Sequence, residues 1–271
     1  MPSWINKDLF QESVKILEEN KIQYADMISY HQMCRWNSGL FYKHPALEHT
    51  QYYWRVEPKV HFFCDVDYDV FRYMQDNNKT YGFTINLYDA PYSIPTLWPE
   101  TIKFLAQHPE YQHENSAMAW LTDRTRRPDH WEQANGYSTC HFWSNFEIAD
   151  MTFWRSQAYE DYFNHLDRAG GFFYERWGDA PVHSVALGLF EDMNKIHWLV
   201  TSLIPPFHSC RRRIRILRCF SAEKRNTDSS RRLRNLGSET LVTSIFLSST
   251  APTHPSARDA SRGASPTARP G

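Results

Sequence analysis

The apolar positions of the chain follow two different periods, one helical and one extended. Near the N-terminus, apolar residues recur at helical spacing over residues 9–20, where Asp8 can cap the first turn. Apolar periodicity, together with a proline at the start of one segment, predicts three further helices over residues 99–107, 153–166 and 182–193. Each of these helices would turn one apolar face towards a core.

Two other stretches predict strands. Residues 60–66 alternate apolar and polar side chains, with Glu57 and Pro58 at the expected strand entrance and Arg55 on the same face as Glu57. Residues 81–87 are almost entirely apolar, which predicts a central strand. Because strands alternate with helices, the pattern predicts an α/β or an α+β domain.

The distribution of charge divides the chain into two parts. Residues 211–271 carry 13 basic and 4 acidic side chains, so their net charge is +9, whereas residues 1–210 have a net charge of −10. The acidic body argues against a nucleic-acid partner. We expect residues 1–205 to form a folded domain. Residues 211–271, a basic tail rich in Ser, Thr, Pro and Arg, are expected to be disordered.

Other features of the sequence give limited information about the compartment of the protein and about metal sites. No apolar run of about 18 residues occurs, so no membrane-spanning helix is expected in this chain. The five cysteines are scattered, without the spacing of a zinc site. The triplet Asn78-Lys79-Thr80 is an N-glycosylation sequon, which is weak evidence for a secretory compartment because such triplets arise by chance.

Two stretches combine acids with large aromatic residues. They are CHFWSNFEIAD at residues 140–150, which contains Glu147, and GGFFYERWGDAPVH at residues 170–183, which contains Asp179. Charges among rings are costly to bury without partners. The pattern therefore favours either a ligand pocket with paired charges or a buried salt-bridge corner, and we expect the two stretches to be the walls of one cleft.

Other candidate residues have competing interpretations. In residues 29–39, Tyr30 and Arg35 could stack on a base and hold a phosphate, or could form a surface pair. The acids of residues 65–69 form D-x-D-x-D, a pattern more typical of a solvated strand edge. The glycine-rich motifs of dinucleotide-binding folds and P-loops, and the nucleophile elbow of α/β-hydrolases, are absent from the sequence.

Several long strings together resemble one family. They include SYHQMCRWNSGLFYKHPAL, YYWRVEPKVHFFCDVDYDVFRYMQ, CHFWSNFEIADMTFWRS and YFNHLDRAGGFFYERWGDAPVHSVALGLF, and they lie within about residues 25–198. The chain resembles the fungal α-1,2-mannosyltransferases of glycosyltransferase family 15. The resemblance implies a GT-A-like mixed sheet flanked by helices and a Golgi location. It also implies GDP-mannose as donor, Mn²⁺ as metal, and retention of the anomeric configuration.

The resemblance also assigns roles to individual residues. Glu147 corresponds to the proposed nucleophile, and Asp179 to an acid of the sugar site. Glu57 corresponds to the acidic metal ligand. The donor-binding residues implied are Tyr30, Arg35 and Arg55.

Two departures from the family pattern accompany the match. The family has an anchor, a stem and the first strands of the nucleotide-binding fold before the region where this chain begins, so that part of the fold is expected to be missing. The family continues after Trp198 with Gly-Tyr-x-His-x-Pro, whose His is the second protein ligand of the metal. Here Ile204 stands at the His position and Lys59 replaces an acid that often follows Pro58.

The sequence therefore predicts a retaining α-1,2-mannosyltransferase that uses GDP-mannose and a mannose-terminated acceptor. The two departures predict weak or no activity for this chain. The alternative is a non-catalytic homologue that binds mannan or a full-length family member, and a third possibility is a product that does not fold stably.

Overall fold

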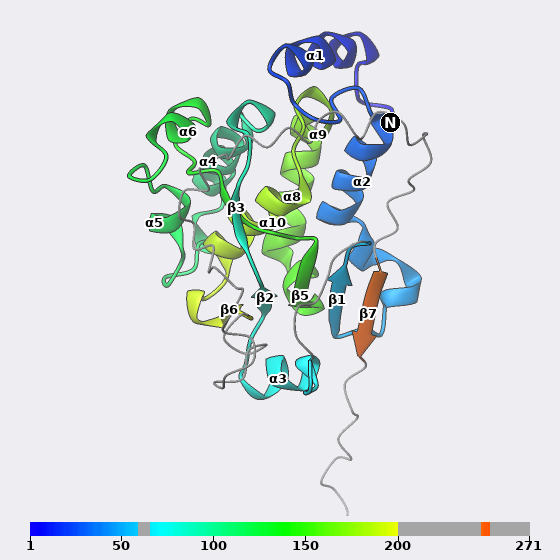
Figure 1. Cartoon of the computed structure of the whole chain (residues 1–271), viewed down its shortest axis with the longest axis vertical. Coiled ribbons are helices and arrows are strands. Elements are labelled where there is room, and N and C mark those ends of the chain that lie inside the picture. Colours follow the sequence, from blue (N-terminus) through cyan, green and yellow to red (C-terminus); the bar gives the residue numbers. More distant parts are fainter. Residues whose placement is uncertain (59–65, 200–244, 250–271) are drawn as a thin grey trace, which may run out of the picture.

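The structure is a computed structural model that describes residues 1–58, 66–199 and 245–249. Its helices are α1 (Lys7–Glu19), α2 (Ile28–Gly39), α3 (Val70–Asp76), α4 (Leu97–Gln107), α5 (Met118–Leu121), α6 (Pro128–Gln133), α7 (Met151–Trp154), α8 (Gln157–Ala169), α9 (Gly171–Tyr174) and α10 (Asp179–Phe190). Its strands are β1 (Tyr52–Val56), β2 (Tyr81–Phe83), β3 (Asn86–Tyr88), β4 (Cys140–Phe142), β5 (Phe146–Asp150), β6 (Ile196–Trp198) and β7 (Ile245–Ser249). Figure 1 shows α1 at one end of the molecule and α3 at the other.

The first helix confirms the predicted apolar face but not the predicted cap. α1 begins at Lys7, and the side chain of Asn6 accepts hydrogen bonds from the first free backbone N–H groups. Asp8 lies inside the first turn instead, where its charge suits the helix dipole. The buried residues of α1 are Phe10, Val14 and Leu17.

The other predicted helices form with altered boundaries. α4 and α10 occupy the expected segments, but α10 begins at Asp179 and ends at Phe190. The segment 153–166 is divided between α7 and α8, because Ser156 caps a new helix with its hydroxyl oxygen. The polar segment 29–39, which ends in a turn signal, lies in helix α2.

The main sheet has the strand order β6-β2-β5-β1-β7. Its β2–β6 pair is parallel, and its other pairs are antiparallel. The predicted strand over residues 81–87 is divided: β2 is internal in the main sheet, and β3 pairs with β4 in a second sheet. Glu57 directly follows β1, so it stands at a strand exit. The strand predicted over residues 60–66 lies almost wholly outside the described residues.

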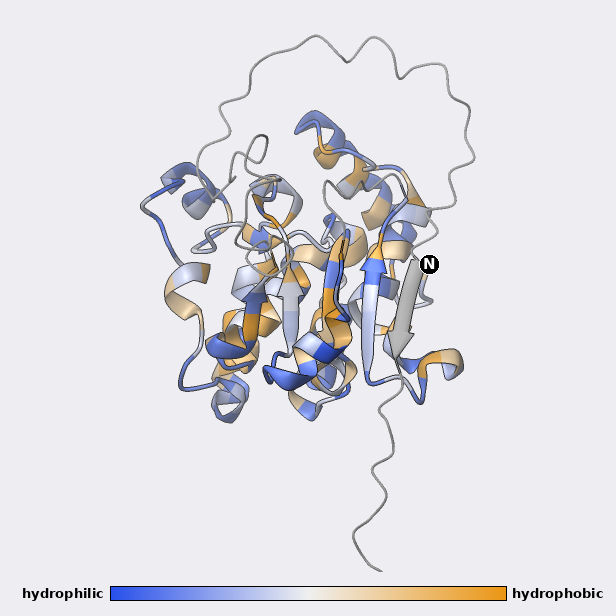
Figure 2. Ribbon diagram, turned by 60° about the horizontal axis from the view of Figure 1, so that its bottom comes forward, coloured by the Kyte–Doolittle hydropathy of each residue, from blue (hydrophilic) through white to orange (hydrophobic). Residues whose placement is uncertain are grey.

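The two faces of the main sheet carry different groups. Tyr52, Phe146 and Ile148 pack with Val70 and Met74 of α3 in a small apolar cluster. The opposite face meets the larger core, which includes aromatic and aliphatic residues of α4, α8 and α10. Figure 2 shows hydrophobic (orange) and hydrophilic (blue) residues interspersed along the helices, with hydrophilic segments prominent in the outer loops. The site described below is built on this second face.

One part of the expected tail takes part in the sheet. β7 pairs along the whole of β1, with Leu247 opposite Trp54. Within residues 211–271, the structure describes only this strand, Ile245–Ser249, and the rest of the expected tail lies outside the described residues. Among the residues that the structure describes, no helix is long and apolar enough to cross a membrane.

Candidate active site

Arg55 joins two of the predicted acids. On β1 it lies opposite Glu147 of β5, so both side chains project from the same face of the sheet. Its Nε and Nη2 donate to one oxygen of Glu57 at 2.9 and 2.6 Å, and its Nη1 donates to Asp179 at 2.5 Å. All three side chains are buried, as expected of charges that are paired. Burial alone would lower the pKa of Arg55, but the facing carboxylates outweigh it and raise that pKa.

Asp179 is held at the first turn of α10. The Ser144 hydroxyl donates to the same carboxylate oxygen as Arg55, at 2.7 Å. Burial by itself would raise the pKa of Asp179, but Arg55, His183 and the Ser144 hydroxyl outweigh it, so that pKa is lowered. The carboxylate therefore stays charged at neutral pH.

Glu147 accepts two tyrosine hydroxyls. Tyr53 of β1 and Tyr81 of β2 each donate to one of its oxygens at 2.8 Å. Burial raises the pKa of both phenols well above the ordinary value, and the neighbouring Glu147 raises it further. Both phenols therefore remain protonated donors, and they orient a carboxylate that is 1% exposed.

His183 adds a proton to this arrangement. Its Nε2 lies 3.0 Å from the backbone oxygen of Asn37, which can only accept, so Nε2 carries a hydrogen. Its Nδ1 lies 3.3 Å from a Glu147 oxygen. Two acceptors cannot bond to each other, so a hydrogen bond here requires a proton on Nδ1 or on the carboxyl group. The contact between His183 and Glu147 therefore holds one hydrogen between a ring nitrogen and a carboxylate oxygen.

The two remaining predicted residues lie differently. Tyr30 of α2 stacks on Tyr24, and the guanidinium of Arg176 lies 5.8 Å from the Tyr30 ring centroid. Arg176 also pairs with Asp89 at 3.3 Å. Arg35, by contrast, forms a two-pronged ion pair with Asp167 of α8 at 2.6 and 2.7 Å. The structure thus brings Glu57, Asp179 and Glu147 together around Arg55, with Arg35 held in a separate pair.

The two acid-and-aromatic stretches are in direct contact. Ser144 and Glu147, from the first stretch, bond to Asp179 and His183 of the second. Their charges are paired, as both alternative interpretations require. Sequence reasoning missed Tyr53, Tyr81, His183 and Ser144. The available signals were the two-residue spacing from Tyr53 to Arg55 and the helical spacing from Asp179 to His183.

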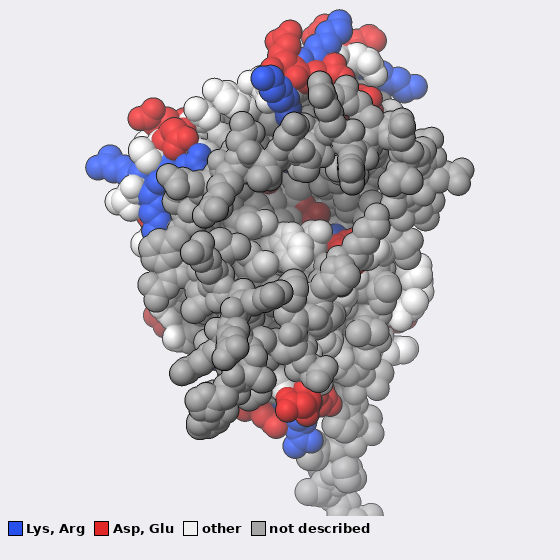
Figure 3. Space-filling model, in the orientation of Figure 1, with Lys and Arg blue, Asp and Glu red and all other residues white. Residues whose placement is uncertain are grey.

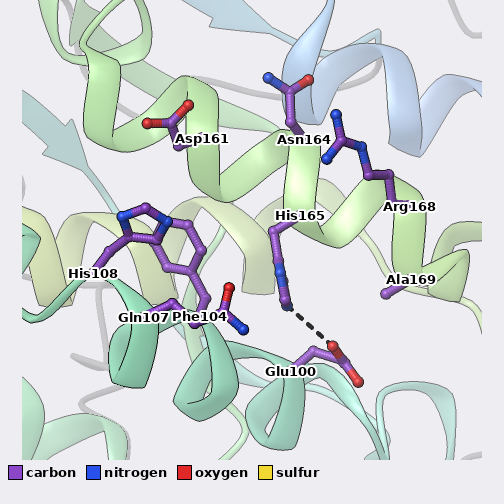
Figure 4. Close-up of a pocket in the computed structure, with 9 residues that line it drawn as sticks. All are labelled: Glu100, Phe104, Gln107, His108, Asp161, Asn164, His165, Arg168 and Ala169. Atoms are coloured by element: carbon purple, nitrogen blue, oxygen red, sulfur yellow. Dashed lines mark hydrogen bonds and ion pairs between the residues drawn. The ribbon is translucent and has the colours of Figure 1, made fainter.

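A separate surface pocket of about 430 Å³ lies between α4 and α8. Figure 4 shows its lining, where His165 of α8 meets Glu100 of α4 at 3.0 Å. None of the predicted site residues lines this pocket. Figure 3 shows acidic and basic atoms set back near the middle of one face, whereas most other charged atoms in view lie towards the edges.

Comparison with known proteins identifies the family. The family model described as glycolipid 2-alpha-mannosyltransferase matches residues 1–232. The probable mannosyltransferase KTR4 of Saccharomyces cerevisiae is 50% identical over 198 residues, which are 73% of this chain and 43% of that protein. The alpha-1,2 mannosyltransferase KTR1 of the same organism is 48% identical over 211 residues, 77% of this chain and 52% of that protein.

Solved structures agree with this assignment. Core-mannan synthase A of Aspergillus fumigatus, in a Mn/GDP form, is 71% identical, with a TM-score of 0.72 over 73% of this chain and 53% of that chain. Ktr4p of S. cerevisiae in complex with GDP is 50% identical, also with a TM-score of 0.72, over 73% of this chain and 50% of that chain. The chain belongs to the glycolipid 2-alpha-mannosyltransferase family, and it spans about half the length of the curated relatives it matches.

The described residues fit a metal ion only as part of a shared site. Within residues 1–58 and 66–199, no group of three or more His, Cys, Asp or Glu side chains is arranged to hold a cation. Glu57 offers a carboxylate, the hard ligand type that Mn²⁺ accepts. Its two bonds from Arg55 fall on a single oxygen, Oε1. By ligand type alone, Glu57 suits one coordination position of such an ion.

Proposed function

We propose that this protein is a retaining α-1,2-mannosyltransferase of the Golgi lumen. In this proposal it transfers mannose from GDP-mannose to a mannose-terminated glycan, with Mn²⁺ bound in part by Glu57. The observation that carries the proposal is the carboxylate of Glu147, oriented by two tyrosine hydroxyls beside Arg55. The printed names of the relatives and the GDP-bound forms of the neighbouring structures support the same reaction class.

The arrangement suits a double displacement. Glu147 attacks the anomeric carbon as the bond to the diphosphate breaks, and the acceptor hydroxyl then displaces Glu147, so two inversions give retention. Tyr53 and Tyr81 orient the nucleophile, and Asp179 receives sugar hydroxyls. Arg55 holds Asp179 and Glu57 at a fixed separation. A divalent cation, when bound, neutralises the leaving diphosphate as a Lewis acid.

The burial of Glu147 allows a second route to the same product. At 1% exposure, the carboxylate can stabilise an oxocarbenium-like centre electrostatically while the acceptor attacks from the side of the leaving group. Mass spectrometry of the protein trapped during turnover separates the two routes. A mannosyl adduct on Glu147 supports double displacement, and retention without an adduct supports the second route.

The test is mannosyl transfer by the purified chain with GDP-mannose, Mn²⁺ and a mannoside acceptor, with the product linkage read by NMR. Glu147→Gln is expected to lower kcat by about 100- to 1000-fold, the cost of losing one preorganised charge contact. Glu110→Gln changes an exposed carboxylate and should leave the rate unchanged. Near-normal transfer by Glu147→Gln would remove its assigned role. The absence of both transfer and calorimetric heat with GDP and Mn²⁺ would favour the non-catalytic alternative.

A further inference from the structure

The turn after α3 gives residue 78 an unusual backbone conformation. Asn78 has a φ of +49°, in the left-handed region that asparagine and glycine tolerate best. Its N–H donates to the backbone oxygen of Gln75 at 3.1 Å, and the N–H of Lys79 donates to that of Met74 at 2.8 Å. These two bonds form a Schellman motif, which ends the helix.

This geometry leaves the carboxamide of Asn78 on the outside of the molecule. Asn78 is exposed, and no hydrogen bond to its side chain occurs within the residues that the structure describes. The turn lies beside α3, at the opposite end of the molecule from α1 (Figure 1). A large group on this side chain would therefore project into solvent without displacing a core residue.

Thr80 completes a sequon at the entry to β2. Its backbone N–H donates to the backbone oxygen of Lys195 at 3.0 Å, and its backbone oxygen accepts from the backbone N–H of Asp150 at 2.8 Å. Its hydroxyl makes no hydrogen bond within the described part of the chain, so the fold there does not depend on it. Asn78-Lys79-Thr80 is the one N-x-Ser/Thr triplet in the sequence, and its middle residue is not proline.

We propose that Asn78 is an N-glycosylation site, an inference that rests on the secretory location in the proposed function. The donor is an oligosaccharide linked to a lipid diphosphate. The Nδ2 atom of Asn78 forms a bond to the anomeric carbon, the bond from that carbon to the diphosphate oxygen breaks, and Nδ2 loses one proton as the lipid diphosphate leaves. The oligosaccharide transferase acts on the sequon in the emerging chain, before Thr80 becomes buried at the start of the internal strand β2.

The experiment uses the tagged full protein, purified from the cells that produce it and treated with a peptide-N-glycosidase. A single increase in gel mobility is expected, with conversion of Asn78 to aspartate in the peptide mass spectrum. Thr80→Val removes the hydroxyl while keeping the β-branched shape, and Asn78→Gly keeps the left-handed turn. Both variants should lose the mobility shift completely. Thr80→Ser and Asn77→Gln, which leave the sequon intact, should keep it.

The possible outcomes distinguish failure of the glycosylation site from failure of the proposed transferase reaction. An unmodified Asn78 peptide in the purified wild-type protein, or a mobility shift that survives in Thr80→Val, would overturn the modification. Mannosyl transfer is measured on the same preparations, and Thr80→Val should retain it. A glycosylated protein without transferase activity would overturn the reaction alone, and an active protein without glycan would overturn the site alone.

Discussion

At the scale of single residues, one guanidinium organises the charges of the candidate site. Arg55 contacts Glu57 and Asp179 at once, and lies opposite Glu147 in the sheet. Lysine could not replace it, because an ammonium lacks the planar fork that reaches two carboxylates. Removing one partner of such a buried group leaves a charge without compensation, which costs about 3–5 kcal/mol. The same contacts therefore affect both stability and chemistry.

Asp179 gives this coupling a pH dependence. Its pKa is lowered from 3.8 in the folded protein, so its ion pair contributes stability above pH 3.8 and loses it as the pH falls through the lower folded value. We expect Asp179→Asn to reduce the free energy of unfolding by about 3–5 kcal/mol at pH 7. The difference in the free energy of unfolding between this variant and the wild type should become smaller below pH 3.8. Denaturant titrations of both proteins across this range measure it.

A matched substitution in an exposed ion pair tests whether the loss of stability depends on burial of the carboxylate. Asp76 forms an exposed ion pair with Arg72, so Asp76→Asn should change the free energy of unfolding at pH 7 by less than about 1 kcal/mol. If Asp179→Asn and wild type differ by the same amount at pH 7 and at the acid end of the range, the proposed stabilisation of the charged carboxylate is wrong.

The sequence revealed the acids of the site more readily than their partners. Glu147 and Asp179 stand out because charges among aromatic residues need an explanation. Tyr53, Tyr81 and His183 do not, since an aromatic residue in a strand or an apolar helix is ordinarily part of the core. Their hydroxyl and imidazole groups acquire a role only when three separate segments meet at Glu147.

At the scale of elements, packing overrides local signals in two places. The Asn-Ser-Gly sequence indicates a turn, yet it completes helix α2, because Gly39 lies against the ring of Phe163 in α8. The periodicity of residues 153–166 indicates one helix, yet Ser156 begins a second. Helix periodicity was sufficient to locate α1, α4, α8 and α10, whereas their boundaries depend on caps and neighbours.

Because α2 and α8 approach closely at Gly39, we expect that this position does not tolerate a larger side chain. A methyl group at Gly39 would lie 2.2 Å from Phe163 ring atoms, so Gly39→Ala must displace the ring or separate the helices. We expect a loss of about 1–3 kcal/mol in the free energy of unfolding, measured by denaturant titration. Gly178→Ala is the control, because its nearest neighbour atom would lie at 3.5 Å. Equal midpoints for the two variants would contradict the packing described.

At the scale of the whole molecule, the sheet depends on contacts between distant segments. The strands have only three to five residues, so their pattern is weak, and their order could not be read from the sequence. The family resemblance supplied the mixed α/β class, which the structure bears out. It could not supply the pairing of β7 with β1, because residues 211–271 have the composition of a disordered tail.

This last pairing covers the edge of β1, the strand that carries Tyr53 and Arg55. An uncovered edge would expose backbone N–H and C=O groups to solvent and to other chains. Leu247→Pro removes one backbone donor of β7, so the N–H groups of β1 that face β7 should exchange faster with deuterium. Those that face β5 should stay protected. Leu247→Ala keeps the donor and should leave exchange in β1 unchanged. Unaltered protection in Leu247→Pro would show that β7 does not cover this edge.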